Sequence, residues 1–174
     1  PRAAFRPEAL RQREGLGGGG PRLYGFGNLV PRSAGVRTLG TIWSSSLFPD
    51  RVPEGYEMLL SYIGGAQAPL RYAPPVEALS ESELAAAVHA DVSRLLLRGP
   101  GPPPAPVVLA VRKWVRAIPQ YNIGYHNIRA EVDRALEGLP GLLLGGNYMS
   151  GVAFGDCVQW GVEAAPRVQA ALRA

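Results

Sequence analysis

The most informative part of the sequence is Leu142-Leu143-Leu144-Gly145-Gly146-Asn147-Tyr148-Met149-Ser150-Gly151, which precedes an apolar segment ending at Leu172. The leucines predict a short buried strand and the glycines predict a turn. A helix over about 156–172 is predicted by the spacing of Val158, Val162, Ala165, Val168 and Leu172. A turn in this position brings backbone amides to a helix N-terminus, which suits a phosphate or an electron-rich carbonyl of a cofactor ring. A tight strand-to-helix connection is the alternative.

Small residues around this turn point to a close approach by a ligand. Gly151, Ala153 and Gly155 would let a flat ring lie near the backbone. Asp156 is expected to cap the last helix, with orientation of a cofactor as the alternative. Cys157 is expected to pack as a small apolar residue.

Length and composition limit the class of protein. The 174 residues suffice for one ordinary domain, and 47% are hydrophobic and 18% charged, which argues against a disordered chain. No run approaches the ~18 apolar residues of a membrane-spanning helix. One cysteine excludes an internal disulfide, and with two histidines no metal site is expected. The net charge is +4 and the basic residues are scattered, so nucleic-acid binding is not expected.

The first part of the chain is predicted to be a loop followed by an antiparallel meander. Residues 1–20 are polar and end in four glycines, and because no strand precedes these glycines they do not form a dinucleotide-binding fingerprint. Strands are expected over 23–30, 38–48 and 57–64, with turn residues between them.

Helical and extended segments are predicted further along. Ser80 and Glu83 form a capping box ahead of apolar residues at helical spacing, in a helix that ends before a proline-rich segment at 99–104. A strand is expected over 107–114 and another helix over 127–136. Trp114 and Phe48 are expected in the core, with a ligand site as the alternative.

Five motifs, in order along nearly the whole chain, resemble the protoporphyrinogen oxidase family and most closely its plastid forms. They are Gly25-Phe26-Gly27-x-Leu29-x-Pro31, Leu39-Gly40-Thr41-Ile42-Trp43-Ser44-Ser45-Ser46-Leu47-Phe48-Pro49, Tyr62-Ile63-Gly64-Gly65, Trp114…Ala117-Ile118-Pro119-Gln120-Tyr121 and Leu144-Gly145-Gly146-Asn147-Tyr148-x-Ser150-Gly151-Val152-Ala153. The pair Asp156-Cys157 departs from the plastid pattern, in which a basic residue often replaces Asp156, and is similar to the animal and bacterial forms.

The resemblance implies a mixed α/β fold like that of the amine-oxidase flavoproteins. It places the chain in the carboxyl-terminal third of such an enzyme. Residues 1–111 would be part of the substrate-binding domain, with a mixed sheet. Residues 112–174 would be the carboxyl-terminal part of the FAD-binding domain, with its closing strand and helix. The family's amino-terminal Rossmann unit has no counterpart in this sequence, so the chain is expected to be a fragment, inactive without the remainder of the polypeptide.

The activity that the resemblance implies is FAD-dependent oxidation of protoporphyrinogen IX to protoporphyrin IX, with O₂ as acceptor, in haem and chlorophyll synthesis. Cofactor-binding roles carry over to Trp114, Asn147, Gly151, Val152, Ala153 and Phe154. Substrate-binding roles carry over to Leu29, in an apolar pocket, and to Phe48, which matches an aromatic stacked on a pyrrole ring. No catalytic base is implied for this part of the enzyme.

The resemblance also implies a plastid location, with the mitochondrion as the alternative compartment. A peripheral membrane surface and a second copy of the chain are the further partners it implies. One alternative function is a non-catalytic porphyrin-binding or interaction remnant that lacks the dinucleotide half. Another is a related flavin enzyme acting on amines or carotenoids, which would share the closing turn but not the motif from Gly40 to Pro49.

Overall fold

The computed structural model describes residues 1–10, 23–66, 74–97 and 102–173. These form two units, Pro1–Lys113 and Trp114–Ala174, each of which is compact by itself. The tetraglycine at 17–20, where the sequence predicts a loop, lies outside the described residues.

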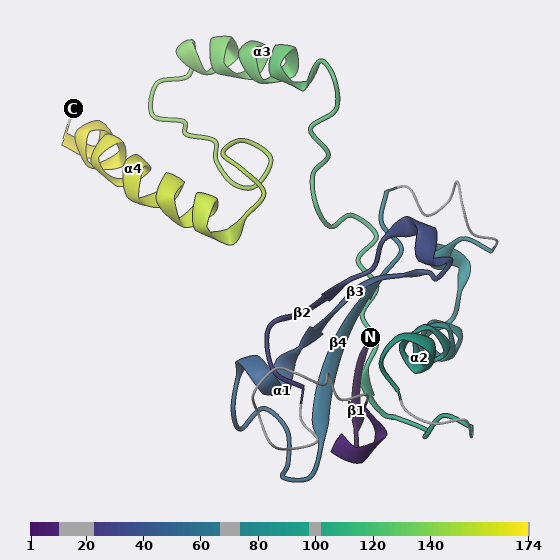
Figure 1. The fold of residues 1–174 in the computed structure, drawn as a ribbon. Coiled ribbons are helices and arrows are strands. Elements are labelled where there is room, and N and C mark those ends of the chain that lie inside the picture. Colours follow the sequence, from purple (N-terminus) through teal and green to yellow (C-terminus); the bar gives the residue numbers. More distant parts are fainter. Residues whose placement is uncertain (11–22, 67–73, 98–101, 174) are drawn as a thin grey trace. The chain divides into compact units, whose positions relative to one another are not determined.

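The first unit is built on a five-stranded sheet in the order β2-β3-β4-β1-β5, with every pairing antiparallel. The strands are β1 (Arg2–Phe5), β2 (Gly27–Leu29), β3 (Thr38–Trp43), β4 (Glu57–Ile63) and β5 (Val107–Ala110). β2, β3 and β4 follow one another as the predicted meander (Figure 1). The mixed sheet expected here is wrong for the described strands, which pair only antiparallel, whereas the mixed α/β class is confirmed by the helices that accompany the sheet.

Strand β1 is the main element that the sequence analysis missed. Residues 1–20 were predicted to be a loop, but β1 lies between β4 and β5 and pairs Ala3 with Leu59 on one side and with Val108 on the other. Phe5 at its end is only 3% exposed. A four-residue strand carries too little alternation to be recognised, because its identity depends on partners far away in the sequence.

The predicted strand over 38–48 is wrong beyond Trp43, where the short helix α1 (Ser44–Leu47) begins. The Ser45 hydroxyl accepts a hydrogen bond from the Met58 amide at 3.0 Å and donates one to the Glu57 carboxylate. A serine side chain thus replaces the next backbone partner of β4, which lets the β3 backbone leave the sheet. The Phe48 amide closes α1 by donating to the Ser44 carbonyl at 3.0 Å.

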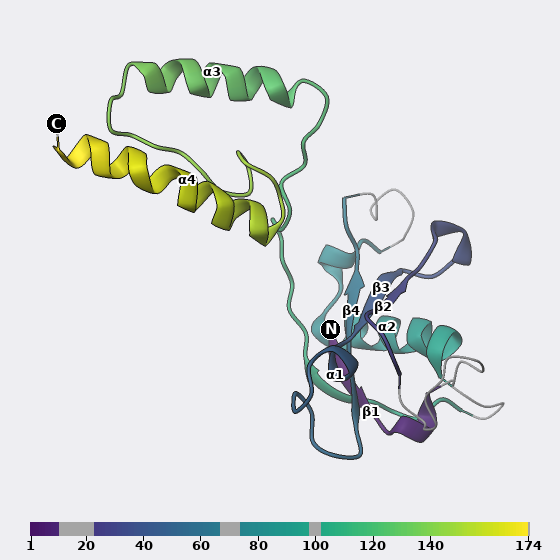
Figure 2. The ribbon, with the colours of Figure 1, turned by 60° about the vertical axis from the view of Figure 1, so that its left-hand side comes forward.

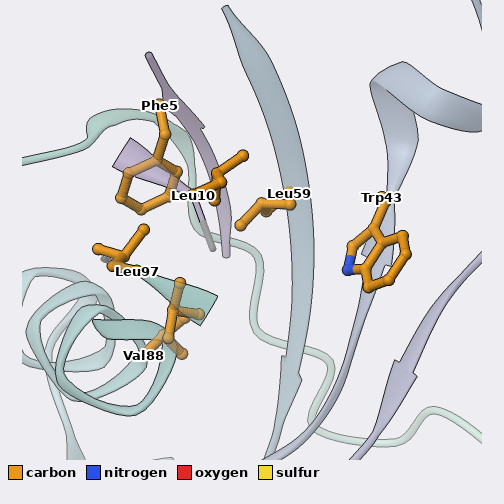
Figure 3. Close-up of a cluster of buried hydrophobic side chains, with 7 residues drawn as sticks. Phe5, Leu10, Trp43, Leu59, Val88 and Leu97 are labelled. Carbon is orange, nitrogen blue, oxygen red and sulfur yellow. The ribbon is translucent and has the colours of Figure 1, made fainter. Parts of the chain in front are cut away.

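Helix α2 (Glu81–Leu96) covers one face of the sheet (Figures 1 and 2). Its predicted capping box is confirmed, since the Glu83 amide donates to Ser80 Oγ at 3.3 Å and the Ser80 amide donates to the Glu83 carboxylate at 2.7 Å. Figure 3 shows the core between this helix and the sheet. Its buried members are Phe5, Leu10, Trp43, Leu59, Val88, Val92 and Leu97.

The remaining elements of this unit are short. Among the described residues, 3-10 helices lie at η1 (Pro7–Ala9), η2 (Arg32–Ala34) and η4 (Val76–Ala78). The strands predicted over 23–30 and 107–114 are present only as β2 and β5. Strand β5 ends at Ala110 because that residue pairs with Arg2, where β1 begins.

The second unit consists of α3 (Tyr125–Glu137) and α4 (Phe154–Arg173), joined by the glycine-rich segment (Figure 2). Both helices confirm the predictions and extend slightly beyond them. The strand predicted at Leu142–Leu144 is wrong, and Leu142 is 47% exposed. A strand needs a partner for its backbone groups, and the described residues of this unit contain no other strand.

Candidate functional site

The turn that precedes α4 is fixed by its own backbone. The amides of Met149 and Ser150 donate to the Gly146 carbonyl at 2.9 and 3.1 Å. Gly151 has a φ of +127°, and a Cβ there would lie 2.2 Å from Asp156 Oδ2. Only glycine fits at this position, because the conformation is strained for other residues and the space is already filled.

Asp156 holds the start of α4, although not from the predicted cap position. The helix begins at Phe154, so Asp156 lies in the first turn, and its carboxylate accepts a hydrogen bond from the Ala153 amide at 3.1 Å. The first amides of a helix have no hydrogen-bond acceptor within the helix. In α4 these include the amides of Phe154 and Gly155, which are exposed residues. Cys157 is half-buried and lies with Sγ 3.9 Å from the Gly151 carbonyl oxygen.

Five of the six predicted cofactor residues lie in this one turn: Asn147, Gly151, Val152, Ala153 and Phe154. Val152 and Phe154 are 47% and 85% exposed, so the turn presents apolar side chains next to helix amides. This combination fits an aromatic ring with a polar edge, such as a flavin. Trp114, the sixth, opens the unit at 69% exposure, so its predicted core position is wrong.

Two tyrosines that the sequence analysis missed hold the same turn. The Tyr121 hydroxyl donates to the Asn147 carbonyl at 2.5 Å, and the Tyr125 hydroxyl donates to the Tyr148 carbonyl. The two tyrosine rings are stacked, with centroids 4.8 Å apart and planes 9° from parallel. Tyr121 precedes α3 and only Tyr125 lies in the helix, so helical spacing could not have indicated the pair.

In the first unit, the sheet face opposite α2 exposes apolar side chains. Trp43 and Leu59 are paired in the core, so residues that alternate with them point the other way. Leu29 pairs with Gly40, and Gly40 pairs with Tyr62, so their positions share this second face. We call it the open sheet face and define it by Leu29, Gly40, Ile42, Leu60 and Tyr62.

Glycines leave the centre of the open sheet face without side chains and let the backbones of β2 and β3 approach closely. A Cβ at Gly40 would lie 2.7 Å from the Asn28 carbonyl oxygen, and one at Gly27 would lie 2.2 Å from that of Thr41. The flanking side chains of Leu29 and Tyr62 are 91% and 51% exposed. A flat floor with an aromatic ring at its side suits a planar apolar ligand.

Phe48 lies away from Leu29, at the opposite end of β3. Phe48 follows α1, which begins after Trp43 at the end of β3. Leu29 pairs with Gly40, which lies about 10 Å before Trp43 along the strand. Phe48 is 50% exposed, so its predicted core position is wrong, and the Arg51 guanidinium lies over its ring at 4.9 Å. The aromatic residue that shares a face with Leu29 is Tyr62, which the motif series contains but which only the register assigns to that face.

Two other kinds of site are absent from the described residues. No helix in the described ranges has the length and apolar character needed to cross a membrane. Among the described side chains, His, Cys, Asp and Glu form no group arranged to hold a metal ion.

Comparison with known proteins gives one family. Residues 3–169 match the model for flavin containing amine oxidoreductases. Over 97% of its length the chain is 44% identical to the chloroplastic protoporphyrinogen oxidases of Nicotiana tabacum and Oryza sativa, covering 28% and 29% of them. Over 84% of its length it is 33% identical to protoporphyrinogen oxidase 2, chloroplastic/mitochondrial, of Arabidopsis thaliana, covering 28% of it. The chain thus spans less than a third of these relatives.

Proposed function

This chain belongs to the flavin-containing amine oxidoreductase family, and from that membership we propose that it forms part of an FAD-dependent protoporphyrinogen oxidase. The reaction is the oxidation of protoporphyrinogen IX to protoporphyrin IX, with O₂ as the electron acceptor. The observation that carries the proposal is the 44% identity to plastid enzymes across 97% of the chain. The names of these relatives also support a plastid location.

The second unit supplies flavin-binding residues, as part of an FAD-binding domain. Gly151 would let the ring approach the backbone, and Val152 and Phe154 would hold the ring and exclude water. The amides of the first turn of α4 would stabilise negative charge on the bound ring. Ala153, Asn147 and Trp114 complete this set. When bound, FAD supplies the capacity to take electron pairs from the substrate and pass them to O₂.

The first unit supplies the substrate side, as part of a substrate-binding domain. The open sheet face receives the tetrapyrrole, with Leu29 and Tyr62 on either side of the glycine floor. Phe48, assigned by resemblance, lies at the α1 end with Arg51 over its ring, and forms the edge of the same binding region.

A chimera tests the proposal. Residues 3–169 replace the matching segment of the tobacco chloroplast enzyme, and the purified protein is assayed for FAD content and for protoporphyrin fluorescence, beside the unaltered tobacco enzyme. We expect about one FAD per chain and oxidation of protoporphyrinogen. A folded chimera with neither flavin nor activity contradicts the proposal. Porphyrin binding without flavin favours the alternative, a non-catalytic porphyrin-binding protein.

A further inference from the structure

We propose that Tyr121 and Tyr125 are positioning residues that orient the turn at 147–149 so that the Tyr148 amide is presented as a hydrogen-bond donor to the flavin. The inference rests on the proposed function, because it takes this turn to face the flavin. Neither tyrosine belongs to the residues to which a cofactor or substrate role has been assigned above.

The turn at 147–149 is held by the two tyrosine hydroxyls. Two consecutive carbonyls, those of Asn147 and Tyr148, each accept a hydrogen bond from one tyrosine hydroxyl. Tyr125 stands in the first turn of α3, and Tyr121 is stacked on it with a centroid distance of 4.8 Å. The two hydroxyl donors therefore lie side by side, and both carbonyls point toward them.

The direction of the Tyr148 N–H follows from the planar trans peptide. The C=O and N–H of one peptide point in opposite directions. Because the Asn147 carbonyl points to the Tyr121 hydroxyl, the Tyr148 N–H points away from the tyrosine pair. The next amide, that of Met149, donates to the Gly146 carbonyl at 2.9 Å, whereas the Tyr148 amide has no hydrogen-bond partner in the described part of the chain. The Asn147 amide also has no partner among the described residues, but of these two amides only that of Tyr148 shares its peptide with a carbonyl held by a tyrosine hydroxyl.

The hydrogen bond from Tyr121 also changes the donor strength of the Tyr148 amide. A hydrogen bond to a carbonyl oxygen polarises its peptide and strengthens the N–H at the other end as a donor. The bond from Tyr121 to the Asn147 carbonyl therefore strengthens the Tyr148 amide as a donor. A preset donor of this kind stabilises charge that develops on a bound ring without reorganisation during the reaction.

The test uses the FAD-loaded chimera with Tyr121→Phe, Tyr125→Phe and the double substitution. Phenylalanine keeps the ring stack and removes only the hydroxyl donors. We expect the double variant to raise the FAD dissociation constant about five- to tenfold, to shift the visible flavin spectrum and to lower the flavin reduction potential. The KM for protoporphyrinogen is expected to stay within about twofold, because the substrate side is unchanged.

Two controls separate positioning from general stability. Tyr24→Phe removes a hydroxyl from a tyrosine that is 86% exposed and has no hydrogen-bond partner in the described residues, so it is expected to change nothing. Asp91→Ala destabilises the first unit, far along the chain from the turn. If the tyrosine variants weaken FAD binding no more than Asp91→Ala does, or leave the spectrum unchanged, the inference is wrong. A chimera that holds no flavin with its native tyrosines overturns the proposed function and this inference together.

Discussion

The carboxylate of Asp91 on α2 accepts hydrogen bonds from both the amide and the hydroxyl of Thr38, at 2.7 and 2.8 Å. A third bond comes from the Arg37 amide at 3.0 Å. Thr38 begins β3 and is 2% exposed. One side chain of α2 therefore fixes the start of β3. This strand carries Gly40 and pairs with β2 and β4, the other two strands of the open sheet face.

Replacing Asp91 by alanine is expected to lower the free energy of unfolding by about 2–3 kcal/mol. The reason is that hydrogen bonds to a charged group contribute about 1.5–3 kcal/mol, and the amide and hydroxyl of buried Thr38 would lose their partner. Urea unfolding followed by circular dichroism measures the change. Asp133→Ala is the control, because Asp133 pairs with Arg129 at 3.9 Å on the surface and its loss should cost less than ~0.5 kcal/mol. Equal losses in the two variants would contradict the assignment.

Two glycine-to-alanine substitutions in the second unit are expected to have opposite signs. Gly151→Ala should destabilise by about 1–3 kcal/mol, because φ there is +127° and the added Cβ meets Asp156. Gly161→Ala, inside α4 with nothing within 4 Å of its Cβ position, should stabilise by about 0.5–1 kcal/mol. Thermal unfolding of the two variants makes the comparison. A Gly151→Ala variant as stable as the parent would show that the turn has another conformation.

The aromatic ring of Tyr62 is expected to contribute to substrate binding. In the chimera, Tyr62→Ala should raise the KM for protoporphyrinogen about tenfold, the equivalent of ~1.4 kcal/mol of lost ring contact. Tyr62→Phe keeps the ring and should leave KM within about twofold of the parent. Phe48→Ala, measured in parallel, shows what the α1 end contributes. If only Phe48→Ala raises KM, the macrocycle binds at α1 and the open sheet face has another role.

The capping box of α2 is expected to make its stability depend on pH. The hydrogen bonds from the Ser80 hydroxyl and amide lower the pKa of Glu83 below its ordinary value of 4.5. A lowered carboxyl pKa means that the ionised form is favoured in the folded state. The stabilisation is therefore present above pH 4.5 and is lost as the pH falls through the lower, folded-state pKa.

Glu83→Gln checks this pH dependence. The parent should be more stable than the variant at pH 7, and the difference should vanish near pH ~3, measured by urea unfolding at each pH. Ser80→Ala should cost about 1 kcal/mol at pH 7 through loss of the N-cap. A difference between parent and Glu83→Gln that stays constant across this range would show that the carboxylate is not stabilised by the cap.

Local patterns predicted the elements whose signals are complete within a few residues. The capping box at Ser80 and Glu83 marked the start of α2, because both partners lie within one turn. The apolar spacing identified α3 and α4, and the turn residues identified the meander of β2, β3 and β4. The motif at 144–153 brought most of the proposed flavin residues together, since they are neighbours in sequence as well as in space.

Elements that depend on distant partners were not predictable in this way. Serine at 45 looks like part of a strand, and only its hydrogen bonds to Glu57 and Met58 explain why a helix begins there. The leucines at 142–144 look like a strand, but a strand forms only where another backbone pairs with it. The role of Tyr62 depends on its pairing with Gly40, and a one-residue shift of register would place it on the core face.

By itself, the sequence determined the three long helices α2, α3 and α4, the meander, the glycine turn and the resemblance, because caps, periodicity and motifs are properties of neighbouring residues. The tertiary structure alone decided that Arg2–Phe5 completes the sheet, that Leu29 and Tyr62 share an open face, and that Tyr121 and Tyr125 hold the turn before α4. These relations join residues that are far apart in the chain. Strand pairing and side-chain hydrogen bonds bring them together, and no local pattern encodes the partner.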